Sequence, residues 1–189
     1  MKIDVHYSPS CGAKFVTSAK LGRLAENGSK YVTEYASLVK IEPKNARDID
    51  ALEKAIFYWE DEKFASNIFH AACAMRNDSK YYINHDVYAL TSQKHIFEDL
   101  DDTKILGLIH LSPIANGTFI EHIQTKPELI YGNAPEYKGV GTAILNSIKR
   151  LTSKISCFPA KEKSIKDFYK KNGFVEYPQG TNCYVWYKA

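Results

Sequence analysis

The chain has 189 residues and a mass of 21.5 kDa, which fits a single domain with a sizeable hydrophobic core. Its 44% hydrophobic and 25% charged residues exclude collagen-like, low-complexity and wholly disordered proteins. The net charge of +3 is too small to indicate a nucleic-acid or membrane surface from bulk charge alone.

The sequence predicts a cytoplasmic protein without a metal site. Its four cysteines, Cys11, Cys73, Cys157 and Cys183, lie far apart and form no C-x-x-C pair. Residues 1–10 lack the profile of a signal peptide, and no uncharged apolar stretch reaches the roughly 20 residues that a bilayer requires.

Residues 1–33 are predicted to be an N-terminal extension of unknown role, ahead of a domain over 34–189. The extension contains a candidate strand at Ile3 to Tyr7 and then a basic segment with a weakly helical pattern. The domain begins with a strand that ends at Ile41, because the following Glu42-Pro43 cannot continue a strand ladder. Two helices, or one bent helix, are predicted over about 48–76, with Asp48 as the cap.

The middle of the chain predicts a sheet. Short apolar runs at 87–90 and 105–111 alternate with turn residues, and Asn116-Gly117 is typical of a hairpin turn before a strand over 118–125. A period of two along this strand places Phe119, Glu121, Ile123 and Thr125 on one face and Ile120, His122 and Gln124 on the other.

The last third of the chain predicts alternating helices and strands. An irregular stretch over 128–138 leads to a helix over 140–151, whose apolar residues recur at helical spacing. A strand over 155–158, a helix over 164–171 and two strands over 174–177 and 183–187 complete the chain.

The glycine pair at the start of the 140–151 helix is suited to an anion. Gly139 and Gly141 let the backbone approach a ligand closely, and the first turn of a helix carries free N–H groups. The helix dipole adds about half a positive charge, and Lys138 adds a mobile cation. A simple turn is the alternative for a G-x-G alone. The third glycine of a dinucleotide fingerprint and the Gly-Lys-Ser/Thr ending of a Walker loop are both missing.

Residues 136–145 (EYKGVGTAIL) resemble the pyrophosphate loop of the GNAT superfamily of acyl-CoA-dependent N-acyltransferases. Residues 168–174 (FYKKNGF) resemble the second signature of that superfamily, at a similar separation. The resemblance covers about residues 35–189. It implies a mixed α/β fold with a central, twisted and mostly antiparallel sheet flanked by helices and splayed where CoA enters. The chain departs from the family in having Glu136 where Gln or Arg is usual, and in a longer insertion between Pro127 and Gly139.

The resemblance implies acetyl-CoA as a co-substrate, with no metal. The pantetheine arm is expected along Ile123 to Thr125 as an added strand, and a backbone N–H near Thr125 would polarise the acyl carbonyl. The residues expected to hold the pyrophosphate are Lys138, Gly139, Val140, Gly141 and Thr142.

Glu121 and Tyr169 are the candidate catalytic residues. An alkyl amine with a pKa of about 10 must lose a proton before it attacks a thioester, and Glu121, expected to be half-buried with a raised pKa, would take it. A cross-strand salt bridge is the alternative role of Glu121. Tyr169 matches the tyrosine that many family members place near the CoA sulfur, where it would protonate the thiolate; core packing is its alternative role.

Other residues are weaker candidates. His110 and His122 are alternative bases. A covalent route through an acylated Cys157 is disfavoured, because the sequence does not place a histidine beside this cysteine. A group of lysines near the 164–171 helix is expected to be mostly solvated. One or two of them could contact the 3′-phosphate of CoA. The group consists of Lys161, Lys163, Lys166, Lys170 and Lys171.

These features predict an acetyl-CoA-dependent N-acetyltransferase that moves the acetyl group directly to a primary amine. The acceptor, a small molecule or a protein amine, has no diagnostic motif. The alternative hypothesis is a non-catalytic acyl-CoA-binding or protein-interaction module on the same fold. Nucleic-acid binding ranks last, no membrane partner is expected, and a homodimer is compatible with the sequence because terminal strands in this family sometimes pair between subunits.

Overall fold

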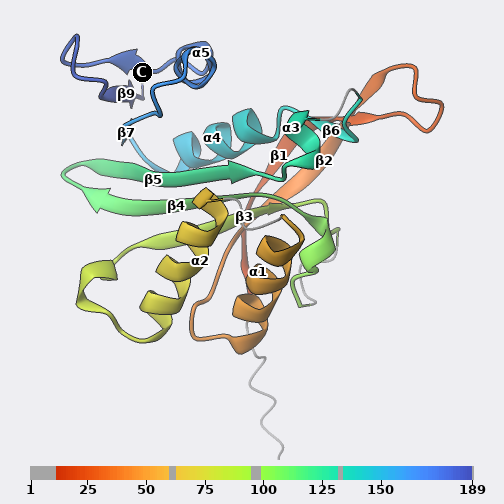
Figure 1. The fold of residues 1–189 in the computed structure, drawn as a ribbon, viewed down its shortest axis with the longest axis horizontal. Coiled ribbons are helices and arrows are strands. Elements are labelled where there is room, and N and C mark those ends of the chain that lie inside the picture. The colour runs from red at the N-terminus through yellow and green to blue at the C-terminus, as the bar shows by residue number, and fades with distance from the viewer. Residues whose placement is uncertain (1–11, 60–62, 95–98, 132–133, 189) are drawn as a thin grey trace, which may run out of the picture.

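A computed structural model of the protein describes residues 12–59, 63–94, 99–131 and 134–188. Over these ranges, nine strands form one sheet in the order β6-β1-β2-β3-β4-β5-β7-β9-β8 (Figure 1). Every neighbouring pair is antiparallel except β5 and β7. The strands are β1 (Lys14–Leu24), β2 (Tyr31–Lys40), β3 (Asp86–Thr91), β4 (Ile105–Ile114), β5 (Gly117–Thr125), β6 (Tyr137–Lys138), β7 (Lys154–Cys157), β8 (Val175–Glu176) and β9 (Tyr184–Tyr187). The predicted α/β fold with a mostly antiparallel sheet is confirmed.

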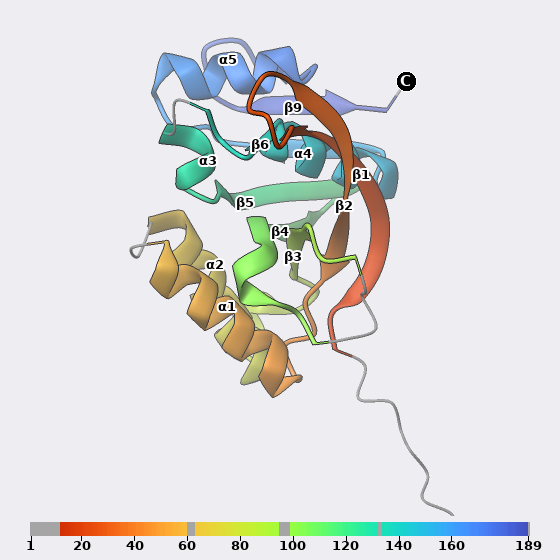
Figure 2. The ribbon, with the colours of Figure 1, turned by 90° about the vertical axis from the view of Figure 1, so that its right-hand side faces the viewer.

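Helices cover both faces of the sheet, with α1 and α2 on one face and α4 on the other (Figures 1 and 2). The helices are α1 (Ala46–Tyr58), α2 (Lys63–Arg76), α3 (Glu128–Tyr131), α4 (Val140–Leu151) and α5 (Lys163–Lys171), with short 3₁₀ turns η1 (Lys80–Tyr82) and η2 (Asp102–Lys104). Leu38 and Ile109 belong to the core under α4, whereas their neighbours Val39 and Leu108 belong to the core under α1 and α2. No helix in the described ranges is long and apolar enough to cross a membrane.

The two helices predicted after the first domain strand are confirmed, but Asp48 is not the cap. Asn45 precedes α1, and its side chain accepts a hydrogen bond from the Arg47 N–H at 2.9 Å. Asp48 is buried and accepts from the N–H groups of Glu42 at 2.9 Å and Ala13 at 3.1 Å. The carboxylate therefore fastens the beginning of β1 and the end of β2 to α1.

The structure corrects the expected extension over 1–33. Its residues from Lys14 onward form β1 and the beginning of β2, so the expected boundary falls inside a strand, and the basic segment is extended rather than helical. Only Ala19 and Leu21 of β1 are buried, which explains why the strand gives so weak an apolar signal. The candidate strand at Ile3 to Tyr7 lies outside the described residues.

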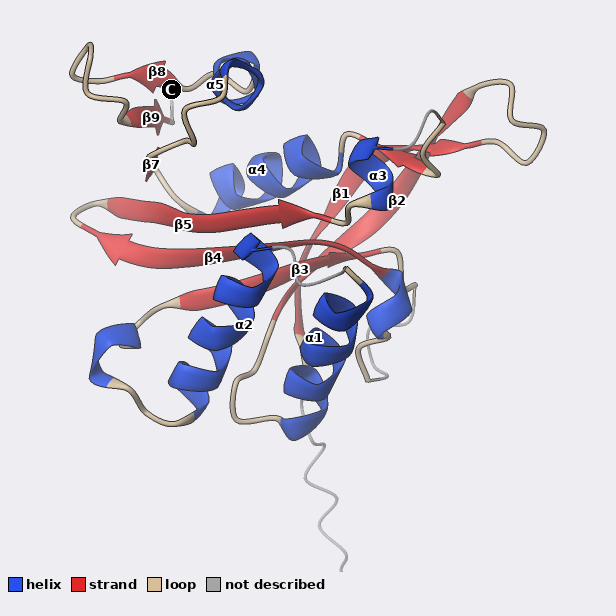
Figure 3. Cartoon of the chain, in the orientation of Figure 1, coloured by secondary structure: helices blue, strands red, loops and turns tan. Residues whose placement is uncertain are grey.

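The stretch over 128–138, expected to be irregular, contains α3 (Figure 3) and β6 (Figure 1). β6 pairs with β1 at Gly22 and Arg23 and so becomes an edge of the sheet. Both elements are too short to produce a periodic pattern in the sequence.

Two glycines allow neighbouring elements to approach closely. A Cβ at Gly117 would lie 2.5 Å from the carbonyl oxygen of Lys154, where β5 begins beside β7. A Cβ at Gly107 would lie 2.8 Å from Ile144 Cδ1 and 3.1 Å from Val140 Cγ1. The helix α4 therefore packs directly on the backbone of β4.

We expect Gly107→Ala to lower the free energy of unfolding by about 1–3 kcal/mol, the usual cost of overpacking a core. Gly22→Ala is the matched control, because its Cβ would meet Tyr31 Cβ at an ordinary 3.4 Å. Urea unfolding of both variants measures the difference. Equal stabilities would contradict the close packing of α4 on β4.

Candidate active site

The strands β5 and β7 lie side by side for three residues and then separate. The paired residues are Thr118, Phe119 and Ile120 of β5 with Ile155, Ser156 and Cys157 of β7. Beyond this point Pro159 has no N–H with which to continue the ladder, and β5 carries a bulge. We call the place where the two strands part, between Glu121 and Phe158, the fork.

A bulge in β5 breaks the expected alternation of its side chains. His110 of β4 pairs with His122, but the next residue, Leu111, pairs with Ile120, so Glu121 is the extra residue. A bulge turns side chains away from the regular pattern and is common beside active sites. The predicted faces of the 118–125 strand are therefore correct only up to Glu121.

The side chains beyond the bulge show the change of face. Ile120 and Ile123 are three positions apart, yet both pack in the core under α4. His122 projects to the opposite face, where its ring stacks on Phe64 of α2 with the ring centroids 5.8 Å apart. The structure therefore separates Ile123 from Glu121, although the sequence placed them on one face.

Glu121 is exposed, not half-buried as expected, and it forms a hydrogen bond across strands. The Ser112 hydroxyl donates to Glu121 Oε1 at 2.5 Å. Ser112 is two residues from His110, whose ring lies 6.0 Å from that of His122, so Glu121 and His122 share the α2 face. Among the described residues, the partner of Glu121 is thus a hydroxyl rather than the cation of a salt bridge.

The backbone of β5 beyond the bulge has one edge turned towards the fork. The Lys126 N–H donates to the Leu106 carbonyl at 2.9 Å, and backbone groups alternate in direction along an antiparallel strand. The groups of Ile123 and Thr125 therefore point away from β4. The Thr125 carbonyl accepts a hydrogen bond from the Gln124 side chain at 2.9 Å. These are the positions predicted to hold a pantetheine arm.

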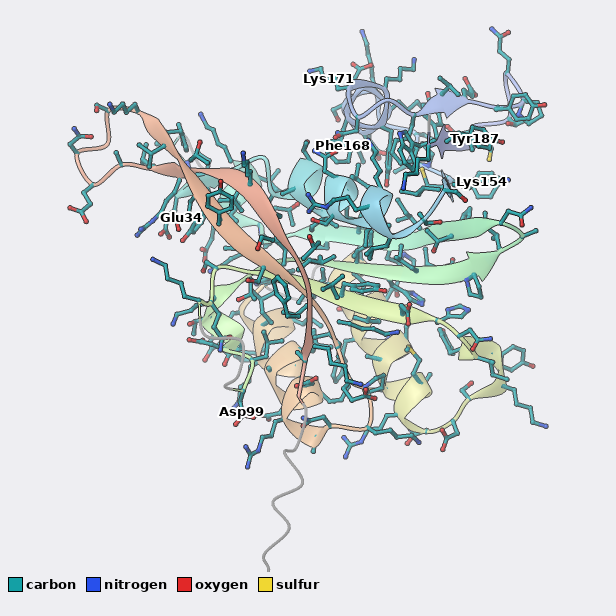
Figure 4. All side chains as sticks on the ribbon, turned by 180° about the vertical axis from the view of Figure 1, so that it is seen from behind. Glu34, Asp99, Lys154, Phe168, Lys171 and Tyr187 are labelled. Atoms are coloured by element: carbon teal, nitrogen blue, oxygen red, sulfur yellow. The ribbon has the colours of Figure 1, made fainter. Side chains whose placement is uncertain are left out.

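The glycine loop presents the first turn of α4 beside this edge. Gly139 has a φ of 80°, a left-handed conformation that favours glycine. The Ala143 N–H donates to the Gly139 carbonyl at 2.8 Å, so the N–H groups of the preceding turn have no acceptor within the helix. A Cβ at Gly141 would lie 3.1 Å from Phe168 Cζ and 3.7 Å from Thr125 Oγ1. Both sequence motifs and the end of β5 thus meet at Gly141, with Phe168 lying between α5 and α4 (Figure 4).

The N-terminal strands hold the loop that precedes α4. The Leu24 N–H donates to the Glu136 carbonyl at 2.8 Å, and the Tyr31 hydroxyl donates to the Pro135 carbonyl at 2.8 Å. The ammonium of Lys138 lies 4.0 Å from the centroid of the Tyr31 ring, so the expected mobile cation has a partner on β2. β1 and β2 therefore position the glycine loop.

Glu136, the departure from the GNAT pattern, pairs with a cation from β1. Its carboxylate lies 3.4 Å from Arg23 Nε, and Arg23 Nη1 lies 3.9 Å from Glu34. Figure 4 shows Glu34 on β2. A cavity of about 740 Å³ opens beside these residues, and Lys104 and Lys126 also line it. The negative charge that Glu136 adds to the loop thus has a nearby counter-charge.

Tyr169 is buried in the core between α5, β7 and β9. Its ring lies 5.3 Å from that of Phe174 and 6.4 Å from that of Tyr184, and the Cys157 thiol is among its neighbours. Burial raises the pKa of Tyr169 and raises the pKa of Cys157 to about 12. Both groups are protonated at neutral pH, which makes the Cys157 thiol a poor nucleophile. The role of Tyr169 as an acid stays a prediction.

Three histidines follow one another on the α2 face. His85 Nδ1 lies 2.9 Å from His110 Nε2, and His110 in turn lies beside His122. Burial, followed by the charges of His85 and His122, lowers the pKa of His110 to about 4, and burial also lowers the pKa of His122. Among the described residues, no group of three or more His, Cys, Asp or Glu side chains is arranged to hold a metal ion.

Comparison with known proteins identifies the fold. No family model and no curated protein matches the sequence. Among solved structures, a protein of the GNAT family from Desulfovibrio desulfuricans superposes with a TM-score of 0.50 at 12% identity, over 82% of this chain and 99% of that one. The chain has the GNAT fold.

Two further solved structures are similar. A GNAT-family acetyltransferase from Staphylococcus aureus Mu50 has a TM-score of 0.48 and 15% identity, over 80% of this chain and 98% of that one. The PaiA N-acetyltransferase from Thermoplasma acidophilum, in complex with coenzyme A, has a TM-score of 0.46 and 16% identity, over 79% of this chain and 96% of that one.

Three residues near the glycine loop and the fork were not singled out by the sequence, namely Arg23, Tyr31 and Phe158. Tyr31 and its partner Pro135 are 104 residues apart, and no local pattern marks such a contact. Phe158 does have a local signal, because an aromatic residue before a proline at the end of a strand lies where pairing stops.

We expect the free energy of unfolding to fall as the pH drops below about 6.5, in part because of His110. The unfolded chain protonates this residue near pH 6.5, whereas the folded protein does so only at a pKa of about 4, so the unfolded state binds more protons between these values. The resulting loss at pH 5 is about 2 kcal/mol. Urea unfolding at pH 7 and pH 5 measures it.

His110→Gln should remove this part of the pH dependence, because an amide does not take up the proton. His70→Gln, at an exposed histidine of α2, is the control and should keep the wild-type slope. Identical slopes in the wild type and His110→Gln would contradict a neutral, buried His110.

Proposed function

We propose that the protein transfers the acetyl group of acetyl-CoA to a primary amine. The observation that carries the proposal is the meeting of three features at Gly141: the open edge of β5, the first turn of α4, and Phe168 of the second motif. The extended thiol arm of CoA needs the open strand edge, and the pyrophosphate needs the first turn of the helix. The two surfaces must therefore lie next to each other.

The backbone provides most of the proposed cofactor site. The pantetheine arm would lie in the fork and pair with Ile123 and Thr125 as an added strand. The pyrophosphate would accept hydrogen bonds from the N–H groups of residues 138–142, where the helix dipole also favours an anion. The pairing of Glu136 with Arg23 supports this placement, because it offsets the carboxylate nearest to the loop.

The acetyl transfer would take place at the fork. Glu121 accepts a proton from the ammonium, and the neutral nitrogen then attacks the thioester carbonyl carbon, whose oxygen is polarised by a backbone N–H near Thr125. The new C–N bond forms as the C–S bond breaks, and the nitrogen loses its second proton, which replaces the one that Tyr169 gives to the thiolate. The departing thiolate takes a proton from Tyr169, and the Ser112 hydroxyl holds the Glu121 carboxylate in place.

We expect Glu121→Gln to lower kcat/KM for acetyl transfer by about 100-fold, because an amide cannot accept the proton. Asp50→Asn is the control, since Asp50 is a carboxylate on the outer face of α1 that pairs with Lys54 at 2.8 Å. Release of the CoA thiol from acetyl-CoA in the presence of an amine measures the rate, and calorimetry measures acetyl-CoA binding.

Equal rates in Glu121→Gln and Asp50→Asn would show that Glu121 is not the base. Tight binding of acetyl-CoA without transfer to any amine would favour the alternative, a non-catalytic acyl-CoA-binding module. Failure of the wild type to bind acetyl-CoA would contradict the proposed function itself.

A further inference from the structure

The α2 face of the fork brings aromatic side chains to the Glu121 carboxylate. Phe158 follows the last residue of β7 that pairs with β5, so it lies opposite Glu121 where the strands part. The Phe158 side chain is 64% exposed, and its ring lies 5.5 Å from that of Phe119. Phe119 pairs with Ser112, the hydrogen-bond partner of Glu121, and therefore lies on the same face.

A second aromatic wall lies on the other side of Glu121. His122 follows it in the bulge and stacks on Phe64 with an angle of 27° between the rings. Phe64 is 38% exposed, so the edge of this pair is open to a ligand. Glu121 therefore lies between the Phe119 and Phe158 pair and the stacked pair of His122 and Phe64.

We propose that this face is the acceptor site and that its acceptor is a primary amine carried by an aromatic body. The inference rests on the proposed acetyl transfer, because the fork places this face beside the expected thioester. The ammonium would bind the Glu121 carboxylate, and the aromatic body would pack on Phe119 and Phe158. Aromatic rings that pack together bury apolar surface and gain from offset or edge-to-face contact.

Two other classes of amine fit this face less well. A free amino acid would bring its own carboxylate close to Glu121, and like charges at short range repel each other. A diamine would place its second ammonium, rather than apolar surface, against the Phe158 wall and would lose part of its hydration there. An aromatic monoamine avoids both costs.

The test compares acceptors at saturating acetyl-CoA. We expect kcat/KM for 2-phenylethylamine to exceed that for n-butylamine, putrescine and free lysine by about tenfold or more, the effect of a few good ring contacts. Thiol release from acetyl-CoA measures each rate. Calorimetric binding of acetyl-CoA, measured in the same preparations, reports separately on the cofactor site.

Substitution of the exposed ring tests the assignment. Phe158→Ala should lower the preference for 2-phenylethylamine over n-butylamine by about tenfold, and Phe158→Tyr should retain it. Tyr35→Ala, at a β2 ring that is 58% exposed, should keep the wild-type preference. Because Phe158 is largely exposed, we expect the alanine variant to fold, and calorimetry measures its acetyl-CoA binding beside that of the wild type.

Three results would overturn the inference. An equal or higher rate with n-butylamine, putrescine or lysine would exclude an aromatic acceptor while leaving the proposed acetyl transfer intact. An unchanged preference in Phe158→Ala would place the acceptor elsewhere. Absence of acetyl-CoA binding in the wild type would instead overturn the proposed function, and the acceptor assignment with it.

Discussion

The short parallel ladder between β5 and β7 is the constraint on which the site depends. Gly117 lets the two strands begin in close contact, because any side chain there would strike the Lys154 carbonyl. The bulge at Glu121 and the missing N–H of Pro159 then end the ladder after three pairs. A longer ladder would use the outward backbone groups of Ile123 and Thr125 for sheet pairing. The fork forms because β5 and β7 pair over three residues only and then separate.

A second requirement is a fixed glycine loop at the mouth of the fork. Glycines give the loop its close approach, but they also give it conformational freedom that must be restrained. Contacts with β1 and β2 supply that restraint, through the Leu24 N–H, the Tyr31 hydroxyl and the Arg23 guanidinium. The buried Asp48 in turn ties the start of β1 to α1. The N-terminal strands thus belong to the candidate site as much as to the sheet.

Local patterns in the sequence were sufficient for most of the fold. Helical spacing predicts α1, α2 and α4, the sequence also predicts α5, and Asn116-Gly117 correctly predicts the hairpin between β4 and β5. β1 was missed because only two of its residues are buried, and the bulge was missed because it depends on the register with β4 rather than on β5 itself. Asp48 was misassigned because a carboxylate near a helix start can serve either as a cap or as a buried acceptor for distant N–H groups.

Part of the candidate site could likewise be predicted from the sequence, and part could not. The glycine loop and the second motif are contiguous in sequence, so their resemblance to GNAT proteins located them, and the structure brings them together at Gly141 and Phe168. Arg23, the counter-charge of Glu136, and Tyr31, the partner of Lys138, lie far away in the sequence. Tyr31 and Pro135, for example, are 104 residues apart. Only the folded chain reveals such contacts.

Calorimetric titration of acetyl-CoA into Gly139→Asn and Gly139→Asp tests the central claim most directly. A Cβ at Gly139 meets no described atom within 4 Å, and both variants impose the same left-handed conformation on a similar side chain. They differ by one negative charge at the N-terminus of α4. If this turn binds the pyrophosphate, Gly139→Asp should bind acetyl-CoA about tenfold more weakly than Gly139→Asn. Equal affinities for the two variants would contradict the assignment of the loop.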